Sequence, residues 1–118
     1  MFARLWRGVA VDGNAEAYRR HATTAVFPSL QALPGHRGAY LLKRSVGGRT
    51  EFLAVTLWES MDSIRAFAGA DAEGAVVEPE AKAVLAEFDA SAWHYEIAYD
   101  GVSVPPSGAP ARAPSRGA

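Results

Sequence analysis

The sequence predicts an α+β protein, a ferredoxin-like four-stranded antiparallel sheet with helices on one face. Two observations predict this fold class. The chain has 118 residues, which is room for one domain and one hydrophobic core. Segments with the two-residue period of strands and the 3.6-residue period of helices alternate in the order β-α-β-β-α-β.

The first strand and the first helix occupy the N-terminal third of the chain. Alternation over residues 2–9 predicts a strand. One face of this strand carries Phe2, Arg4 and Trp6. Residues 12–14, Asp-Gly-Asn, indicate a turn with a candidate helix cap. A helix is predicted from Ala15, and Pro28 is expected to kink or end it because proline lacks the amide hydrogen that a helix needs.

The next two strands are predicted over residues 37–46 and 50–58, and Gly47-Gly48 between them indicates a hairpin turn. Both faces of the third strand are mainly apolar. One face carries Leu53, Val55 and Leu57, and the other carries Phe52, Ala54, Thr56 and Trp58. Helices on one side cover only one face of a sheet, so a second copy of the chain is the simplest cover for the other. A homodimer is therefore predicted, and a few exposed apolar residues are the alternative.

The last third of the domain is predicted to add two helices and a strand. Ser60 is the expected cap of a helix that ends near Gly69, and Glu78-Pro79 is the expected start of the last helix. The inward side chains of these helices are Ile64 and Phe67, and then Val84, Leu85 and Phe88. The fourth strand is predicted over residues 92–99.

The composition changes at Gly101, which divides the chain into a domain over residues 1–100 and a tail over residues 101–118. The tail holds four of the seven prolines and neither an aromatic nor an acidic residue. Such a segment buries too little apolar surface to become ordered, so a flexible tail is predicted.

Composition and charge also argue against several classes of partner. Twelve basic and thirteen acidic residues give a formal charge of −1, which disfavours nucleic acid as a partner. No apolar run approaches the ~20 residues that span a bilayer, so no membrane partner is expected. The chain has no cysteine, which excludes disulfides and thiolate catalysis. Without a signal peptide at the N-terminus, the expected location is cytoplasmic.

Four strings carry a family resemblance, in this order along the chain: RLWRG, PGHRGAYLLKR, EFLAVTLWESMDSIRAFAG and HYEIA. Over about residues 1–99 the chain resembles the antibiotic biosynthesis monooxygenase family of the dimeric α+β barrel superfamily. The resemblance implies that two sheets pair into a dimeric α+β barrel. It also implies an oxidoreductase, a cofactor-independent monooxygenase that acts on a small aromatic, polyketide-type substrate in secondary metabolism.

The superfamily includes other activities, because a fold does not fix a function. The alternatives are a non-catalytic small-molecule-binding or stress-associated protein, and an isomerase or cyclase. Haem-degrading relatives need an asparagine in the first strand, a tryptophan in the helix after the third strand, and a histidine about ten residues later. Here Leu-Trp-Arg stands at residues 5–7, Phe67 stands at the tryptophan position, and the ligand position falls near Val76 or Val77. We therefore expect neither haem degradation nor a cofactor.

A cofactor-free oxygenase needs a dry pocket, a proton acceptor and donors that hold a phenolate. The candidate catalytic residues are His21, His94 and Tyr40. The candidate substrate-binding residues are Arg4, Trp6, Arg44, Trp58 and Phe67. Each aromatic or histidine among them has the alternative of an ordinary core or surface residue.

Arg4 is the least expected residue on its strand face, since a buried guanidinium requires a carboxylate or a ligand anion. Arg44 shares a face with Tyr40 and Leu42, and either arginine could hold a phenolate or carboxylate of a substrate. Either could instead form a structural pair with Glu51, Glu59 or Glu96. No metal site is expected, because no two of the three histidines have the i, i+4 spacing of a helical metal pair.

Overall fold

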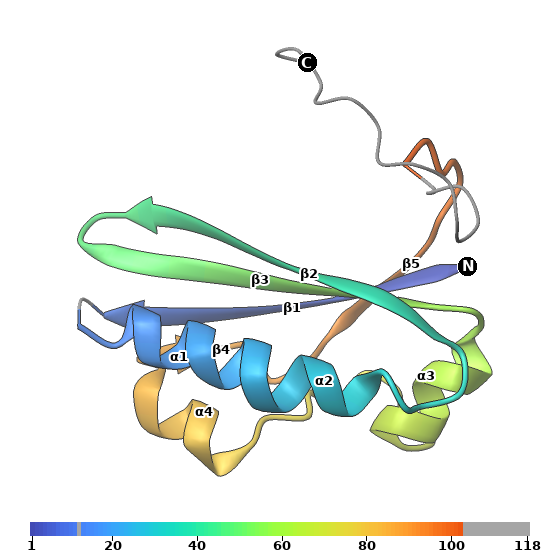
Figure 1. Ribbon diagram of the computed structural model, residues 1–118, viewed down its shortest axis with the longest axis horizontal. Coiled ribbons are helices and arrows are strands. Elements are labelled where there is room, and N and C mark those ends of the chain that lie inside the picture. The colour runs from blue at the N-terminus through green and yellow to red at the C-terminus, as the bar shows by residue number, and fades with distance from the viewer. Residues whose placement is uncertain (12, 103–118) are drawn as a thin grey trace.

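The computed structural model describes residues 1–11 and 13–102, and shows a twisted antiparallel sheet with helices along one face (Figure 1). The strands are β1 (Phe2–Val11), β2 (His36–Val46), β3 (Arg49–Trp58), β4 (Glu87–Phe88) and β5 (Trp93–Glu96). The helices are α1 (Ala15–His21), the π-helical turn η1 (Ala22–Val26), α2 (Phe27–Leu30), α3 (Met61–Ala68) and α4 (Pro79–Val84). The strand order is β2-β3-β1-β4, and β5 also pairs with β1. The predicted ferredoxin-like α+β fold is confirmed.

The pairing of β1 with β3 sets the two faces of the sheet. Arg4 lies opposite Thr56 and Trp6 opposite Ala54, so the alternation predicted for both strands is confirmed. This face points toward the helices. The β2–β3 hairpin turns at Gly47 and Gly48 with φ values of +56° and +79°. Two positive φ values are what a two-residue hairpin turn requires, and glycine adopts them without strain.

The first helical segment does not end at Pro28, which was one of the two outcomes expected there. The helix neither ends there nor breaks, because α1, η1 and α2 follow one another without a gap from Ala15 to Leu30. Pro28 lies in the first turn of α2, directly after the wider π-helical turn. A missing amide hydrogen costs little at that position. Asn14 stands at the N-cap of α1 without a side-chain cap hydrogen bond, and Asp12 of the predicted turn lies outside the described residues.

The C-terminal elements agree with the prediction at α3 and differ after α4. Ser60 Oγ accepts a hydrogen bond from the Ser63 amide over 3.1 Å, and α3 ends at Gly69, whose φ is +103°. The placement of Phe88 on the last helix was wrong, although its side chain does pack against the first core cluster. The helix ends at Val84, and Phe88 pairs with Gly8 in the short strand β4. The fourth strand predicted over residues 92–99 is the shorter β5.

Two apolar clusters fill the space between the sheet and the helices. The first consists of Ala10, Tyr18, Ala22, Phe52, Ala81 and Leu85. The second consists of Leu30, Trp58, Ile64 and Ala72. Within the described residues, no helix is long and apolar enough to cross a bilayer. The predicted tail lies outside the described residues from residue 103 onward.

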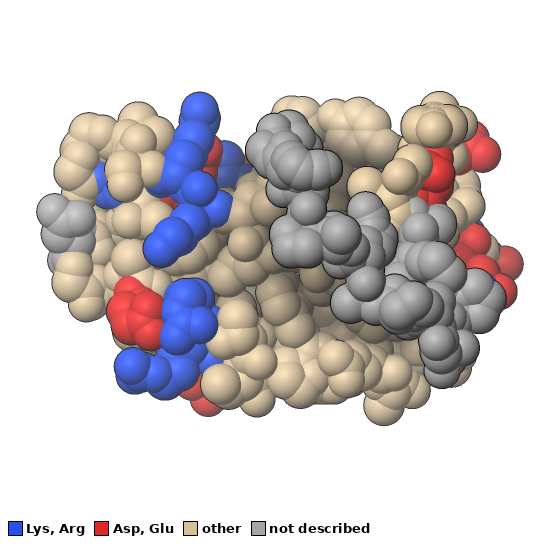
Figure 2. Space-filling model, turned by 45° about the horizontal axis from the view of Figure 1, so that its top comes forward, with Lys and Arg blue, Asp and Glu red and all other residues tan. Residues whose placement is uncertain are grey.

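The opposite face of the sheet carries no helix (Figure 1). Its exposed apolar side chains include Tyr40, Leu42, Trp93 and Tyr95. Leu5, Leu53 and Val55 lie beside them across the strands, and Leu57 follows Val55 on the same face of β3. We call these eight residues the open sheet face. Figure 2 shows lysine and arginine side chains gathered toward the β2–β3 hairpin end, with mostly uncharged surface beside them.

Candidate functional site

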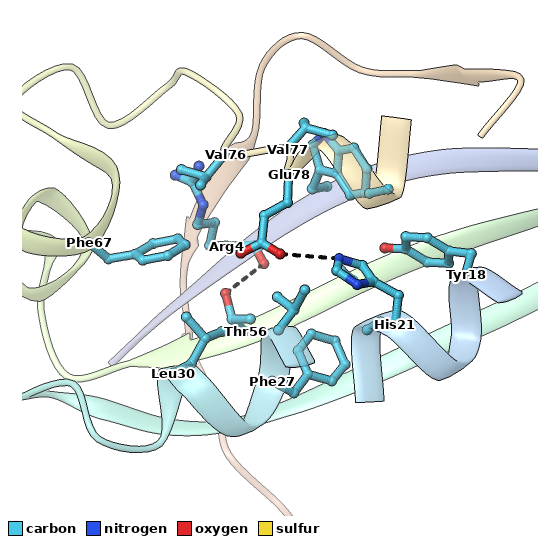
Figure 3. A pocket seen from close by; sticks show the side chains of 15 residues that line it. Arg4, Tyr18, His21, Phe27, Leu30, Thr56, Phe67, Val76, Val77 and Glu78 are labelled. Atoms are coloured by element: carbon cyan, nitrogen blue, oxygen red, sulfur yellow. Dashed lines mark hydrogen bonds and ion pairs between the residues drawn. The ribbon is translucent and has the colours of Figure 1, made fainter. Parts of the chain in front are cut away.

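A pocket lies between the two core clusters, under the helix-facing side of the sheet (Figure 3). Its walls come from β1, β3, the α1–η1–α2 segment and the chain that leads into α4. The cavity has a volume of about 70 Å³, taken as the space that the centres of water molecules can reach. Most of the lining is apolar, and the polar exceptions among the lining residues are Arg4, Tyr18, His21, Thr56 and Glu78.

His21 and Glu78 meet at one side of this pocket (Figure 3). The His21 side chain is 13 % exposed, and its Nε2 atom lies 3.2 Å from Glu78 Oε1. The two groups are close but too poorly aligned for a hydrogen bond, so this buried ring nitrogen has no hydrogen-bond partner among the described residues. When both ring nitrogens carry a proton, the positively charged imidazolium would form an ion pair with the Glu78 carboxylate. The arrangement can therefore accept a proton and stabilise the resulting charge.

Glu78 was expected only as the residue before the last helix. It stands at the N-cap of α4, and α4 packs against α1. This packing joins two residues that are 57 positions apart in the chain. The Glu-Pro sequence predicts the helix start, but no local signal indicates which side chain the carboxylate will meet.

Arg4 is buried at the pocket wall, with 5 % of its surface exposed. Its NH1 group donates to the Ala72 carbonyl over 2.5 Å and to His94 Nε2 over 2.8 Å, and its NH2 group donates to the Gly74 carbonyl over 2.8 Å. No carboxylate pairs with it among the described residues. Its guanidinium also lies 5.6 Å from the centre of the Phe67 ring. Arg4 thus ties the chain before α4 to the sheet.

His94 lies on β5 opposite Arg4. Burial and the neighbouring Arg4 cation lower its pKa from the ordinary 6.5, since both disfavour the charged imidazolium. His94 is not among the residues that line the pocket. Of the two predicted histidines, the structure brings His21 to the pocket and places His94 behind Arg4.

The aromatic candidates divide between the pocket and the core. Trp6 and Phe67 line the pocket, and Trp6 Nε1 is satisfied by the Asp89 carbonyl at 2.7 Å. Trp58 is fully buried and does not line the pocket. Its ring stacks on Phe67 at 5.5 Å between centres, so it supports the wall from behind.

Tyr40 and Arg44 lie on the other side of the sheet, with the open sheet face. Tyr40 is 53 % exposed and pairs across the strands with Val55. Arg44 forms an ion pair with Glu51, one of the three carboxylates considered for it. The structure does not bring these two side chains to the pocket.

One group of side chains at the pocket mouth could hold a cation. His21, Glu78 and Glu80 each place a ligand atom within 4.8 Å of the others. An imidazole with two carboxylates is a donor set that suits several divalent metals. The expectation of no metal rested on histidine spacing, which does not test a set with two glutamates.

Comparison with known proteins identifies the family. Residues 9–79 match the model of the family described as antibiotic biosynthesis monooxygenase, which is more than half of the chain. No match was found among curated proteins.

Solved structures share the fold. A candidate antibiotic biosynthesis monooxygenase from Bacillus cereus superposes with a TM-score of 0.63 at 14 % identity, over 89 % of this chain and 98 % of that one. The haem-degrading enzyme MhuD from Mycobacterium tuberculosis, solved with two haems in its active site, gives a TM-score of 0.55 at 24 % identity, over 85 % and 98 %. At these identities the likeness extends to the fold alone.

Proposed function

The chain belongs to the antibiotic biosynthesis monooxygenase family, and from this premise we propose that it catalyses cofactor-independent monooxygenation of a small aromatic phenol of secondary metabolism. The reaction takes place in the pocket under the sheet. The observation that supports this proposal is the pairing of His21 with Glu78 in an otherwise apolar, aromatic-walled pocket. A pocket that served only to bind an apolar molecule would need no titratable pair.

Cofactor-independent oxygenation of a phenol requires a base, an apolar site and molecular oxygen. His21 takes the proton of the phenol hydroxyl, and Glu78 stabilises the imidazolium that forms. The phenolate then gives electrons from its ring carbon to O₂. Overall, one phenol and one O₂ give one quinone and one water. The substrate supplies all the electrons, one oxygen atom enters the ring, and the other leaves as water with two substrate hydrogens.

Haem does not fit the residues at this site. The positions that would carry the haem-degrading tryptophan and histidine hold Phe67 and Val76 or Val77, and all three line the pocket. Neither valine offers a ligand atom to iron. We therefore route no step through haem, and the haem-degrading activity of MhuD is not proposed for this chain.

We propose a homodimer as the working form. Tyr40, Trp93 and Tyr95 are 53 %, 60 % and 52 % exposed on the open sheet face. Monomers rarely leave contiguous apolar areas of this kind in water. A second copy that presents the same face removes both from solvent and completes a dimeric α+β barrel. The partners we propose are thus a second copy and the small aromatic molecule, in the cytoplasm.

Oxygen uptake by the purified chain tests the proposed reaction. 1-Naphthol is supplied with air and without any added cofactor, in the presence and absence of EDTA. We expect uptake of one O₂ per quinone formed, insensitivity to EDTA, and loss of uptake in His21→Asn. EDTA-sensitive uptake would assign the reaction to a metal at His21, Glu78 and Glu80. Substrate loss without oxygen would favour an isomerase or cyclase, and binding without turnover would favour a binding protein.

A further inference from the structure

Tyr18 is a buried residue whose polar end has no partner. It lies on α1 with 5 % of its surface exposed, and its ring packs against Phe52 at 4.8 Å and Trp6 at 6.5 Å between centres. These contacts engage only the ring. Among the described residues no group forms a hydrogen bond with the hydroxyl, which points toward the His21 ring at the pocket (Figure 3). The hydroxyl oxygen itself is not enclosed, so a water molecule or a ligand oxygen in the pocket can accept its hydrogen bond.

The Tyr18 hydroxyl is a donor at every working pH. Burial raises the pKa of Tyr18 to about 12, because the apolar surroundings disfavour the phenolate. At neutral pH the group therefore keeps its proton and can donate it to an acceptor oxygen. Tyr18 and His21 are three positions apart on a helix, so their side chains lie on the same side. One ligand oxygen can approach both.

The charges around the pocket favour a ligand without a carboxylate. Glu78 already places a carboxylate at the lining. Arg4 is the only cation of fixed charge among the lining residues, and its guanidinium is engaged by two backbone carbonyls and His94. A ligand carboxylate would meet repulsion without a free counter-charge. A neutral hydroxyl or carbonyl oxygen meets neither penalty.

The volume of the pocket indicates the size of the group that it can enclose. About 70 Å³ is open to the centres of water-sized molecules, which corresponds to about five or six waters and to roughly 150–200 Å³ of displaced liquid. A one- or two-ring arene fits the enclosed part of the pocket, and a larger molecule would extend out of its open side. The walls of Trp6, Phe27 and Phe67 suit a flat ring system.

We propose that the pocket recognises a neutral, one- or two-ring aromatic molecule through a hydrogen bond from the Tyr18 hydroxyl to a phenol or ketone oxygen of the ligand. The inference rests on the proposed function for the location of the site, and it adds the ligand class and the residue that selects it.

Ligand binding measured in the absence of oxygen tests this inference separately from the proposed oxygenation. Titration calorimetry under nitrogen measures the affinities of 1-naphthol, naphthalene and 1-naphthoate for the full chain. We expect 1-naphthol to bind about five- to tenfold more tightly than naphthalene, the effect of one added hydrogen bond, and 1-naphthoate to bind more weakly than 1-naphthol. Tightest binding by 1-naphthoate would overturn the inference without any variant.

Tyr18→Phe then assigns the preference to the hydroxyl, and Tyr99→Phe is the matched control because Tyr99 is exposed and outside this pocket. In Tyr18→Phe the preference for 1-naphthol over naphthalene should fall to near one while naphthalene affinity stays the same. An unchanged preference would overturn the inference even if oxygen uptake occurs. If the Tyr18-dependent preference is found without any oxygen uptake, the proposed oxygenation fails and the ligand class stands.

Discussion

His94 Nε2 accepts a hydrogen bond from the buried Arg4 guanidinium over 2.8 Å. Arginine has only donors, so Nε2 must be unprotonated and the imidazole is neutral, with its proton on Nδ1. The two residues are 90 positions apart and meet because β1 and β5 are adjacent strands. Protonation of His94 would remove this acceptor and place a second cation beside Arg4, which makes the pair sensitive to pH.

We expect stability to fall as the pH drops below about 6.5. Burial and then Arg4 lower the pKa of folded His94 from 6.5, with Glu73 opposing them, and burial lowers the pKa of His36 in the same direction. The unfolded chain therefore binds these protons more readily than the folded chain. The stabilisation is present above the unfolded pKa and is lost as the pH falls below it. Urea unfolding at pH 7.5 and pH 5.5 measures the difference.

His94→Gln is the variant for this measurement, because glutamine keeps an acceptor for Arg4 and does not titrate. We expect it to reduce the loss of stability between the two pH values, leaving the part due to His36. An equal loss in the variant and the unmodified chain would mean that the contact with Arg4 does not couple to protonation.

Arg4→Met should destabilise the fold by about 1–3 kcal/mol, because it leaves the buried Ala72 carbonyl without its donor. Chemical denaturation measures this free energy. Arg44→Met is the matched control, since Arg44 is exposed and its ion pair with Glu51 lies at the surface, where such pairs contribute about 0–1 kcal/mol. Equal losses in the two variants would contradict the structural role of Arg4.

The sequence predicted the parts of the fold that depend on neighbouring residues. The Gly47-Gly48 hairpin, the Ser60 cap and the Pro79 helix start were correct, because turn and cap preferences act over a few positions. The partners of Arg4 could not be predicted in this way. The side chain was expected to need a carboxylate, yet it is satisfied by carbonyls about seventy residues away.

Alternation alone also could not decide which face of the sheet the helices cover. Both faces of β3 are apolar, so the pattern left either face free to form the pocket. Tyr40 and Arg44 were included among the site residues, and they lie with the open sheet face. Glu78 was missed for a related reason, since its contact with His21 depends on how α4 packs against α1.

Trp58→Ala should cost about 3–5 kcal/mol of unfolding free energy. Trp58 is fully buried in the second core cluster, and its Nε1 donates to Thr56 Oγ1 over 2.8 Å. The substitution removes both the packing under α3 and that hydrogen bond. Tyr99→Ala is the comparison, because Tyr99 is 86 % exposed and lies outside the open sheet face. A near-neutral effect at Trp58 in urea titration would place its side chain outside the core.

His21→Asn and Glu78→Gln should each reduce the rate of oxygen uptake by about 10²–10⁴-fold, the usual contribution of a general base. Asparagine cannot take the proton, and glutamine cannot stabilise a charged imidazole. Tyr40→Phe should leave the rate unchanged, since Tyr40 lies on the other side of the sheet. Melting temperatures of all three variants establish that they fold. If Tyr40→Phe lowered the rate of oxygen uptake and the His21 and Glu78 variants kept the normal rate, the reaction would have to be assigned to the open sheet face.

Val55→Asp should split the proposed dimer. Val55 lies at the centre of the open sheet face, between Leu5 on β1 and Tyr40 on β2, so an interface that buries this face would have to bury the new carboxylate, at a large desolvation cost. Ser45→Asp adds the same charge to an exposed position of the same sheet and should leave the dimer intact.

Analytical ultracentrifugation at micromolar concentration measures the mass of both variants, and the unmodified chain is expected at twice its 12.5 kDa mass. Because Val55 faces away from the pocket, the monomeric variant should keep its cooperative unfolding. A single species of 12.5 kDa for the unmodified chain would contradict the dimer and, with it, the closed barrel.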